Sequence, residues 1–459
     1  MSEIIRPTQG SGLLRAAASR RNFLKQSSKA VAGGALLSAL PIERFAYGAV
    51  SPGDTLRIAL VGCGGRGSGA ADQALSTSGD VKLVAVADAF KDRAESAIRN
   101  IKKQHENKCD VADSAKFIGF EGYKEAIAMA DVVILATPPG FRPIHFEEAI
   151  RQGKHVFMEK PVATDAAGVR KVLAAAQEAK KKNLKVGVGL QRRHQAPYIE
   201  TVKRLHDGAI GDITSMRIYW NGTTPWVRPR AEIEKQLGRK PTEMEYQMRN
   251  WYYFVWLCGD HIVEQHIHNM DVANWVMKGY PVKAHGMGGC EVRKGPDYGE
   301  IFDHHAVEFE YPGGVRVYSQ CRHINGCWND VSEHAVGTKG TCHVGGGRGE
   351  YTIRDLKGEV VWRYQGGGKN PYQQEHDDLF DAIRNDKPYS EAESGAKSSF
   401  TAILGRMATY SGKVLEWDKA IESGISVMPK EFAWDAETPV KPGADGIYPR
   451  AIPGKTQVI

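Results

Sequence analysis

The sequence predicts an α/β domain with a doubly wound parallel sheet, followed by an α+β domain with a large, open and mainly antiparallel sheet. Three observations predict this fold class. Short apolar runs alternate with longer helical segments over residues 54–190, a glycine-rich loop follows the first run, and beyond residue 193 the expected strands become amphipathic and adjacent. Strands separated by helices pair in parallel, whereas adjacent amphipathic strands form an antiparallel sheet with one open face.

The first domain, residues 54–190, is expected to contain five buried strands. They are residues 56–61, 81–87, 131–136, 155–158 and 185–189, and the helices between them end near residue 74 or cover residues 91–103, 144–151 and 166–181. Gly62, Asp88, Thr137 and Glu159 each follow one of these strands. Because ligands of such sheets bind at the carboxyl ends of the strands, we expect the functional site there.

The second domain, residues 191–416, is expected to form its sheet from residues 214–219, 282–287, 306–311, 315–320 and 332–337. Two helices are expected at residues 260–277 and 375–384, and residues 222–250 form a long polar insertion. Residues 417–459 are rich in proline and glycine, which predicts a surface arm.

Residues 1–49 have the pattern of a twin-arginine signal peptide. Arg20 and Arg21 precede Phe-Leu-Lys, a short apolar run follows at residues 30–40, and small residues stand at positions 46, 48 and 49. The pattern predicts export of the folded protein to the periplasm, and the alternative is a basic amphipathic tail. No run reaches the roughly 18 apolar residues of a membrane-spanning helix, so no membrane span is expected.

Charge and cysteine content exclude several classes of protein. Seven basic and two acidic residues precede Val50, so most of the formal net charge of +7 lies in the signal and no nucleic-acid-binding face is expected. The seven cysteines are scattered, without a CxxC pair, which argues against a disulfide framework or a structural zinc site. A protein that folds in the cytoplasm before export has no need of disulfides.

The glycine-rich loop has the spacing of a dinucleotide-binding motif. Residues 62–67 read GCGGRG between an expected strand and an expected helix, and Asp88 ends the next strand 21 residues after Gly67. Glycines at these positions let the backbone approach a pyrophosphate at the helix N-terminus, and the aspartate accepts hydrogen bonds from the ribose. The motif predicts a Rossmann domain that binds NAD rather than NADP. The alternative is a glycine-rich loop in an ordinary α/β fold.

Two further elements carry side chains suited to catalysis. Lys160, at the end of a strand, is expected to point into the ligand crevice, although an ion pair with Glu159 is an alternative. In the helix at residues 260–277, Glu264 and His268 are four residues apart and share a face, with His261 nearby. A carboxylate beside a histidine tunes a proton acceptor. The alternatives are a metal site with His261, Glu264 and His268 as ligands, or a helix with solvated charges.

Together these elements resemble the glucose–fructose oxidoreductase and inositol dehydrogenase family, often written Gfo/Idh/MocA. The resemblance covers nearly the whole chain after the signal and rests on GCGGRG at 62–67, ATPP at 136–139, GKHVFMEKP at 153–161, GLQRRH at 189–194, GAIGDI at 208–213 and HNMD at 268–271. It implies an oxidoreductase in which Lys160 lies in the active site and His268 is the acid/base. Glu264 stands where the family usually has aspartate, and we expect it to orient His268.

The predicted binding residues fall into two sets, and no metal ligand is assigned. The cofactor set is Gly62, Cys63, Gly64, Gly65, Arg66, Gly67, Asp88, Thr137, Pro138, His145, Glu159, Lys160, Gln191 and Arg193. The substrate set is Trp226, Arg228, His261 and Asp271. Aromatic rings around the insertion can stack on a sugar ring and arginines can hold its hydroxyls, although core packing is the alternative for many of these aromatics.

The sequence therefore predicts a periplasmic, NAD-dependent oxidoreductase that oxidises a ring hydroxyl of a sugar or glycoside. The periplasm holds little free dinucleotide, so NAD is expected to be loaded before export and to stay bound. The alternatives are NAD-dependent cleavage of a glycoside by transient oxidation, and a non-catalytic sugar-binding protein with structural NAD. The open face of the second sheet suggests a homodimer or homotetramer.

Overall fold

Six parallel strands form the first sheet, in the order β3-β2-β1-β4-β5-β6. They are β1 Leu56–Val61, β2 Val81–Asp88, β3 Lys116–Ile118, β4 Val132–Leu135, β5 His155–Met158 and β6 Val186–Val188. Every neighbouring pair is parallel. The strand order reverses between β1 and β4, which opens a crevice at their carboxyl ends. The predicted Rossmann fold is confirmed, with β3 as an additional short edge strand.

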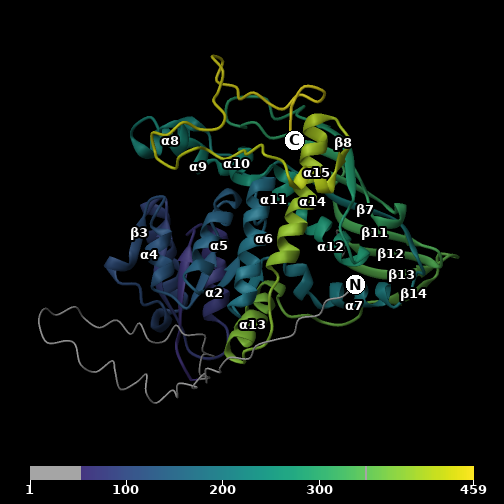
Figure 1. The fold of residues 1–459 in the computed structure, drawn as a ribbon, viewed down its shortest axis with the longest axis horizontal. Helices are drawn as coiled ribbons and strands as arrows, with labels where there is room; N and C mark the ends of the chain where they lie inside the picture. The colour runs from purple at the N-terminus through teal and green to yellow at the C-terminus, as the bar shows by residue number, and fades with distance from the viewer. Residues whose placement is uncertain (1–52, 347–348) are drawn as a thin grey trace, which may run out of the picture. The chain divides into compact units, whose positions relative to one another are not determined.

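Helices cover both faces of this sheet (Figure 1). One face carries α2 Gly65–Leu75, α3 Lys91–Gln104 and α13 Pro371–Arg384, and the other carries α4 Tyr123–Ala128, α5 Arg142–Arg151 and α6 Ala166–Lys181. Burial on both faces explains why the strands are continuous apolar runs in the sequence. Helix α13 lies in the segment assigned to the second domain, yet its Leu379, Phe380 and Ile383 pack against the first sheet.

The computed structural model describes residues 53–346 and 349–459, which belong to one compact unit. The expected signal peptide, residues 1–49, lies outside the described residues, and export remains a prediction. Among the described residues, no helix combines the length and the apolar character that crossing a bilayer requires.

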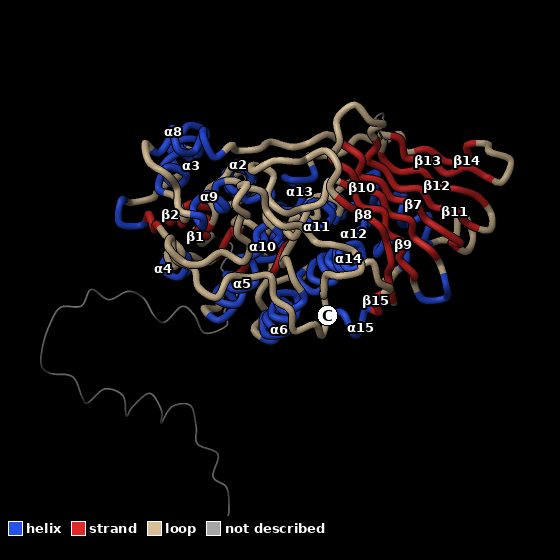
Figure 2. The backbone as a smooth tube through the Cα atoms, turned by 90° about the horizontal axis from the view of Figure 1, so that it is seen from above, coloured by secondary structure: helices blue, strands red, loops and turns tan. Residues whose placement is uncertain are grey.

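Nine strands form the second sheet, in the order β14-β13-β12-β11-β7-β10-β9-β8-β15. They are β7 Ile213–Gly222, β8 Lys283–Gly289, β9 His304–Glu310, β10 Arg316–His323, β11 Asp330–Gly337, β12 Gly340–Gly345, β13 Glu350–Asp355, β14 Val360–Arg363 and β15 Leu415–Glu416. All neighbours are antiparallel except β7 and β10. Figure 2 shows these strands gathered at one end of the described chain. The predicted large, mainly antiparallel sheet is confirmed.

The helix expected at residues 260–277 is broken in two. Helix α11 covers His261–Glu264 and α12 covers Ile267–Met277, while Asp260 before them has a φ of 76°. The carboxylate of Asp260 accepts hydrogen bonds from the backbone N–H of Phe302 (2.9 Å) and the hydroxyl of Tyr410 (2.6 Å), which fixes α11 independently of α12. A consequence of the break is that the carbonyl of Glu264 is free to accept a side-chain hydrogen bond.

Helix α14, Ala392–Ser411, is not predicted from the sequence and occupies the centre of the described fold. It contacts α6 of the first domain as well as α12, β8 and β9 of the second. Its residues are buried on nearly every side and are mostly alanine, serine, threonine and other small or apolar types. A helix without a polar face shows no amphipathic periodicity, so the pattern that identifies surface helices is absent here.

The insertion and the C-terminal arm pack together. The insertion, residues 222–250, contains α8 Arg230–Leu237 and α9 Glu243–Arg249, and is followed by α10 Val255–Cys258. The C-terminal arm, residues 417–459, begins with α15 Trp417–Ile421 and then passes over α8, α9 and α10 (Figure 1). Val440 and Tyr448 of the arm are buried in a core shared with the insertion. The composition predicts a surface arm, whereas the structure shows that part of the arm is buried against the insertion.

Replacing Leu404→Ala in α14 should lower the free energy of unfolding by about 2–5 kcal/mol, because the side chain is fully buried in a helix that contacts both domains. Denaturant unfolding measures the change. The matched control Leu356→Ala removes a side chain that is 73% exposed and should stay within about 0.5 kcal/mol of the parent. Equal effects of the two substitutions would contradict the central role of α14.

Candidate active site

A cleft of about 570 Å³ opens at the carboxyl ends of the first sheet and reaches α11 and α12. It brings together most of the residues predicted from the sequence. The predicted residues that line it are Gly62, Gly64, Gly65, Arg66, Gly67, Asp88, Thr137, Pro138, His145, Glu159, Lys160, Gln191, Trp226, Arg228, Glu264 and His268. Cofactor, catalytic and substrate candidates thus share one cavity.

The glycine-rich loop fits a dinucleotide. A Cβ atom on Gly62 would lie 2.3 Å from the backbone nitrogen of Thr137, and one on Gly67 would lie 2.0 Å from the carbonyl oxygen of Gly62. These two positions therefore require glycine, and the loop is tightly packed on its inner side. Gly64 and Gly65 have no heavy atom within 4 Å of their Cβ positions and line the cleft, so their backbone is open to a ligand. An open backbone at a helix N-terminus suits a pyrophosphate.

Asp88 is held beside this loop by the backbone. Its carboxylate accepts hydrogen bonds from the N–H groups of Cys63 (2.7 Å) and Phe90 (2.9 Å). Burial raises the pKa of Asp88 above its usual value, and these two hydrogen bonds oppose the rise. The carboxylate lines the cleft at the end of β2, where it can accept hydrogen bonds from ribose hydroxyls. Cys63 itself is buried beneath the loop, so only its backbone contributes.

Two arginines fix the ends of β4 and β5 on either side of the cleft. Arg142 donates to the carbonyl of Glu159 (2.9 Å) and to the carbonyl of Thr137 (2.7 Å). Arg66 donates to the carboxylate of Glu159 (2.5 Å). Glu159 is thus paired with Arg66 of the glycine-rich loop and not with Lys160, which excludes the surface ion pair that was the alternative for Lys160.

Lys160 reaches across the cleft to the second domain. Its ammonium donates to the carbonyl of Glu264 (2.5 Å) and lies 3.1 Å from the carboxylate of the same residue. Both side chains are largely buried, with 13% and 14% exposed. The carbonyl is available because the helix breaks after Glu264. The ion pair therefore places a cation from β5 at the start of the helical segment that carries the histidine.

His268 lines the cleft next to this ion pair and stacks on Trp220, with ring centroids 5.8 Å apart and an angle of 24° between the rings. Its Nδ1 is buried without a hydrogen-bond partner among the described residues. Burial, reinforced by Lys160 and Arg192, lowers the pKa of His268 well below its usual value, so the imidazole is neutral. The expected contact in which Glu264 orients His268 is not formed, because the helix break removes the i,i+4 geometry on which it depends.

Arg193 and Asp271 were predicted for the cofactor and the substrate, but the structure pairs them with each other. The guanidinium of Arg193 donates two hydrogen bonds of 2.8 Å to the carboxylate of Asp271, which also accepts one from the hydroxyl of Ser398 (2.7 Å). This bidentate pair fixes the short helix Gln191–His194 onto α12. Neither residue lines the cleft, and the pair satisfies hydrogen-bonding groups of both side chains.

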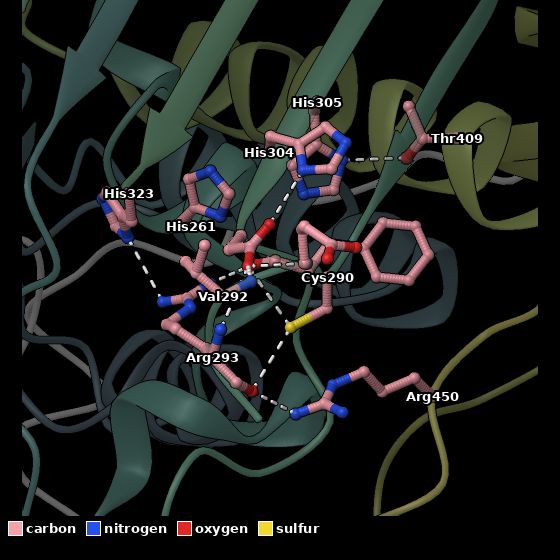
Figure 3. A network of polar contacts seen from close by, with 12 residues as sticks. His261, Cys290, Val292, Arg293, His304, His305, His323, Thr409 and Arg450 are labelled. Carbon is pink, nitrogen blue, oxygen red and sulfur yellow. Dashed lines mark hydrogen bonds and ion pairs between the residues drawn. The ribbon is translucent and has the colours of Figure 1, made fainter. Parts of the chain in front are cut away.

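His261 is also placed away from the cleft. It is fully buried, and Figure 3 shows it between His323 and His305. Its Nδ1 lies 2.9 Å from the carboxylate of Asp260. Asp260, His261 and His305 offer one ligand atom each within 4.8 Å of one another, and Nε2 of His305 lies 3.3 Å from the carboxylate of Asp260. His261, Glu264 and His268 are not brought together, so the alternative metal site with these ligands is not formed.

Several cleft residues were missed in the sequence. They include Phe90, Arg93, Phe120, Arg142, Arg249, Gln265 and Tyr372. Gln265 lies in the helix break, where its side-chain oxygen is 2.7 Å from Nε2 of His323. Gln265 could be assigned to the cleft only if the helix break were predicted. Tyr372 reaches the cleft from α13, a remote segment, and nothing in the sequence indicates this position.

Comparison with known proteins agrees with this geometry. A family model described as "Oxidoreductase family, NAD-binding Rossmann fold" (GFO_IDH_MocA) matches residues 56–189, and the "GFO/IDH/MocA C-terminal domain" matches residues 198–343. Together they span more than half of the chain.

Three individual proteins illustrate the similarity. Scyllo-inositol 2-dehydrogenase (NAD(+)) of Bacillus subtilis is 24% identical over 341 residues, which are 72% of this chain and 87% of that protein. 2,7-anhydro-N-acetylneuraminate hydratase of Escherichia coli is 24% identical over 52% of this chain and 60% of that protein. The crystal structure of aldose-aldose oxidoreductase from Caulobacter crescentus superimposes with a TM-score of 0.62 at 19% identity, covering 79% of this chain and all of that one. The last comparison shows the shared fold.

Replacing Gly67→Ala should weaken NAD binding and lower the free energy of unfolding by about 1–3 kcal/mol, because the new Cβ must displace the backbone of Gly62. Calorimetric titration with NAD and thermal unfolding measure the two effects. Gly69→Ala in the same helix is the matched control, since its Cβ would meet its nearest neighbour at an ordinary 3.4 Å. Normal NAD affinity in the Gly67 variant would mean that the loop is not the cofactor site.

Proposed function

Because the chain belongs to the Gfo/Idh/MocA oxidoreductase family and has its NAD-binding Rossmann domain, we propose that it oxidises a ring hydroxyl of a sugar or glycoside with NAD held in the cleft. One observation carries the proposal. Lys160, Glu264 and the neutral His268 line the same cavity as the open backbone of the glycine-rich loop. The arrangement provides a proton acceptor and a cation beside a cofactor site.

The side chains divide the chemistry between them. When bound, the nicotinamide supplies a hydride acceptor for the carbon that carries the hydroxyl. The neutral imidazole of His268 accepts the hydroxyl proton as the hydride leaves that carbon. The ammonium of Lys160 stabilises the negative charge that develops on the oxygen, and Glu264 holds that ammonium in place through its carboxylate and its carbonyl.

The substrate class follows from the cleft lining and from the relatives. Trp220 stacks on His268 in the cleft, Trp226 and Trp251 line the same cleft, and aromatic rings stack on the apolar faces of sugar rings. The Bacillus subtilis relative is named for oxidation of an inositol, a ring that carries secondary hydroxyls as a sugar does. Both observations support an uncharged polyhydroxylated ring as the substrate.

A second candidate is cleavage or rearrangement of a glycoside through transient oxidation, with no net change in the redox state of NAD. The Escherichia coli relative is named as a hydratase, a reaction without net oxidation. The same three catalytic residues serve both candidates, because each begins with removal of a hydride and a proton from a ring hydroxyl.

We further propose that the protein acts in the periplasm after export in the folded state. The twin-arginine pattern at residues 20–25 supports this location. A folded export route allows NAD to be bound before transport and retained afterwards.

Self-association as a homodimer or homotetramer is expected through the exposed face of the second sheet, where Met287 is 78% exposed.

The proposal is tested by incubating the purified protein with a panel of sugars, glycosides and cyclitols. We expect a keto product by mass spectrometry and reduction of NAD by absorbance. Lys160→Met and His268→Gln should each lower turnover by about 10²–10⁴-fold, because each removes a group that acts on the reacting hydroxyl. Lys181→Met changes an exposed lysine on α6 and should leave turnover unchanged.

The outcomes separate the candidates. Release of aglycone without net NAD reduction would select transient oxidation over net oxidation. Absence of keto product, NAD reduction and bond cleavage with every substrate would overturn an enzymatic role. Equal activity of the parent, Lys160 and His268 proteins would exclude the proposed catalytic residues.

The pH profile of kcat/KM should show no loss of activity as the pH falls through 6.5, the usual pKa of histidine. Burial and the cation of Lys160 lower the pKa of His268, so the uncharged acceptor persists to lower pH than it would for an exposed histidine. NMR titration of the imidazole, assigned with His268→Gln, checks the cause directly. An imidazole that titrates at or above 6.5 would contradict the mechanism.

A further inference from the structure

The cofactor half of the cleft is covered by two segments outside the first sheet. The insertion, residues 222–250, contributes Trp226, Arg228, Met248 and Arg249 to the cleft lining. These side chains face the ends of β1 and β2, which contribute Gly64, Gly65 and Asp88. The insertion therefore lies opposite the part of the cleft that is built to receive the dinucleotide.

The C-terminal arm supports the same wall. The ring centroid of Trp434 lies 5.2 Å from that of Phe90 and 4.6 Å from that of Phe120. The ring centroids of Phe432 and Phe141 are 5.1 Å apart. Phe90, Phe120 and Phe141 all line the cleft. The arm thus packs behind the cofactor side of the cavity and fixes the loops that form it.

A second cavity of about 580 Å³ adjoins the cleft and is lined by the glycine-rich loop, by α3 and by the insertion. Five residues line both cavities: Gly64, Gly65, Arg93, Arg228 and Arg249. Three guanidinium groups therefore stand at the junction of the two cavities, next to the open backbone of the loop. Arg93 comes from α3, whereas Arg228 and Arg249 both come from the insertion, Arg249 at the end of its α9.

The charge of these arginines is only partly compensated. Arg249 lies 3.4 Å from Asp92 and 3.6 Å from Glu245. Within the described part of the chain, the side chains of Arg93 and Arg228 form no ion pair, although the charges of Asp92 and Glu232 act on Arg228, which lies 5.4 Å from the ring centroid of Trp226. Burial, together with the charges of Arg93 and Arg249, lowers the pKa of Arg228. An anion at the junction would relieve this crowding of like charges.

We propose that Arg93, Arg228 and Arg249 clamp the diphosphate of the bound dinucleotide and so slow its release. This inference rests on the proposed function, in which NAD stays bound through export and turnover. Guanidinium groups bind phosphate oxygens in pairs, and such charge-assisted hydrogen bonds are stronger than neutral ones. The clamp assigns Arg228 to the cofactor, whereas the sequence predicted a substrate contact.

The test compares Arg228→Gln and Arg93→Gln with the parent and with Lys235→Gln. Lys235 is the matched control because it is an exposed cation of the same insertion that lines neither cavity. The full-length proteins are purified, passed through gel filtration, and the NAD released on denaturation is quantified by absorbance and mass spectrometry. We expect both arginine variants to lose NAD and the Lys235 variant to retain it as the parent does.

Binding measurements on the NAD-free proteins identify the group that the arginines hold. Loss of one contact should raise the dissociation constant of ADP-ribose, which carries the diphosphate, by about 10–100-fold. Binding of adenosine, which lacks phosphate, should be unchanged. Circular dichroism and thermal unfolding of the NAD-free variants confirm that they are folded.

Two results would overturn the clamp. One is unchanged retention of NAD and unchanged ADP-ribose affinity in both arginine variants. The other is weaker binding of a phosphorylated sugar with normal ADP-ribose affinity, which would assign the cations to the substrate. None of these measurements requires turnover, so a protein that retains NAD through the arginines but oxidises no sugar would refute the proposed function and leave the clamp intact.

Discussion

The candidate active site depends on one charged contact, between the ammonium of Lys160 and the carboxylate and carbonyl of Glu264. Lys160 lies two residues after the end of β5 in the first domain, and Glu264 ends the short helix α11 of the second domain. Both groups are largely buried, so removal of either would leave an uncompensated charge in a poorly solvated place. The contact also requires the break between α11 and α12, because a continuous helix would occupy the Glu264 carbonyl.

This contact changes how the histidine is tuned. With the carboxylate of Glu264 committed to Lys160, His268 has no acidic partner among the described residues, and burial beside cations lowers its pKa. A histidine of low pKa is a weak base, so proton removal from a hydroxyl depends on the neighbouring ammonium stabilising the oxygen that remains. The imidazole of His268 and the ammonium of Lys160 therefore act together, and Glu264 holds the ammonium in place.

The sequence predicts the first domain closely and the second only in outline, for physical reasons. Buried strands with a glycine-rich loop leave few alternatives, and β1 and β5 begin and end where they are expected. Helix α14 lacks a polar face and gives no periodic signal. The Glu264–His268 contact and the metal alternative both assume an unbroken helix. The Arg193–Asp271 pair joins residues 78 positions apart, which a single sequence does not reveal.

The position of α13 has a consequence for how the chain can be divided. Leu379, Phe380 and Ile383 complete the core of a sheet whose strands end at residue 188, and α13 lies more than 180 residues further along the chain. The two halves of the molecule are thus interleaved in sequence although they are separate layers in space. A fragment cut after residue 190 would expose an apolar sheet face to solvent, so the nucleotide-binding half should fold cooperatively only within the complete polypeptide.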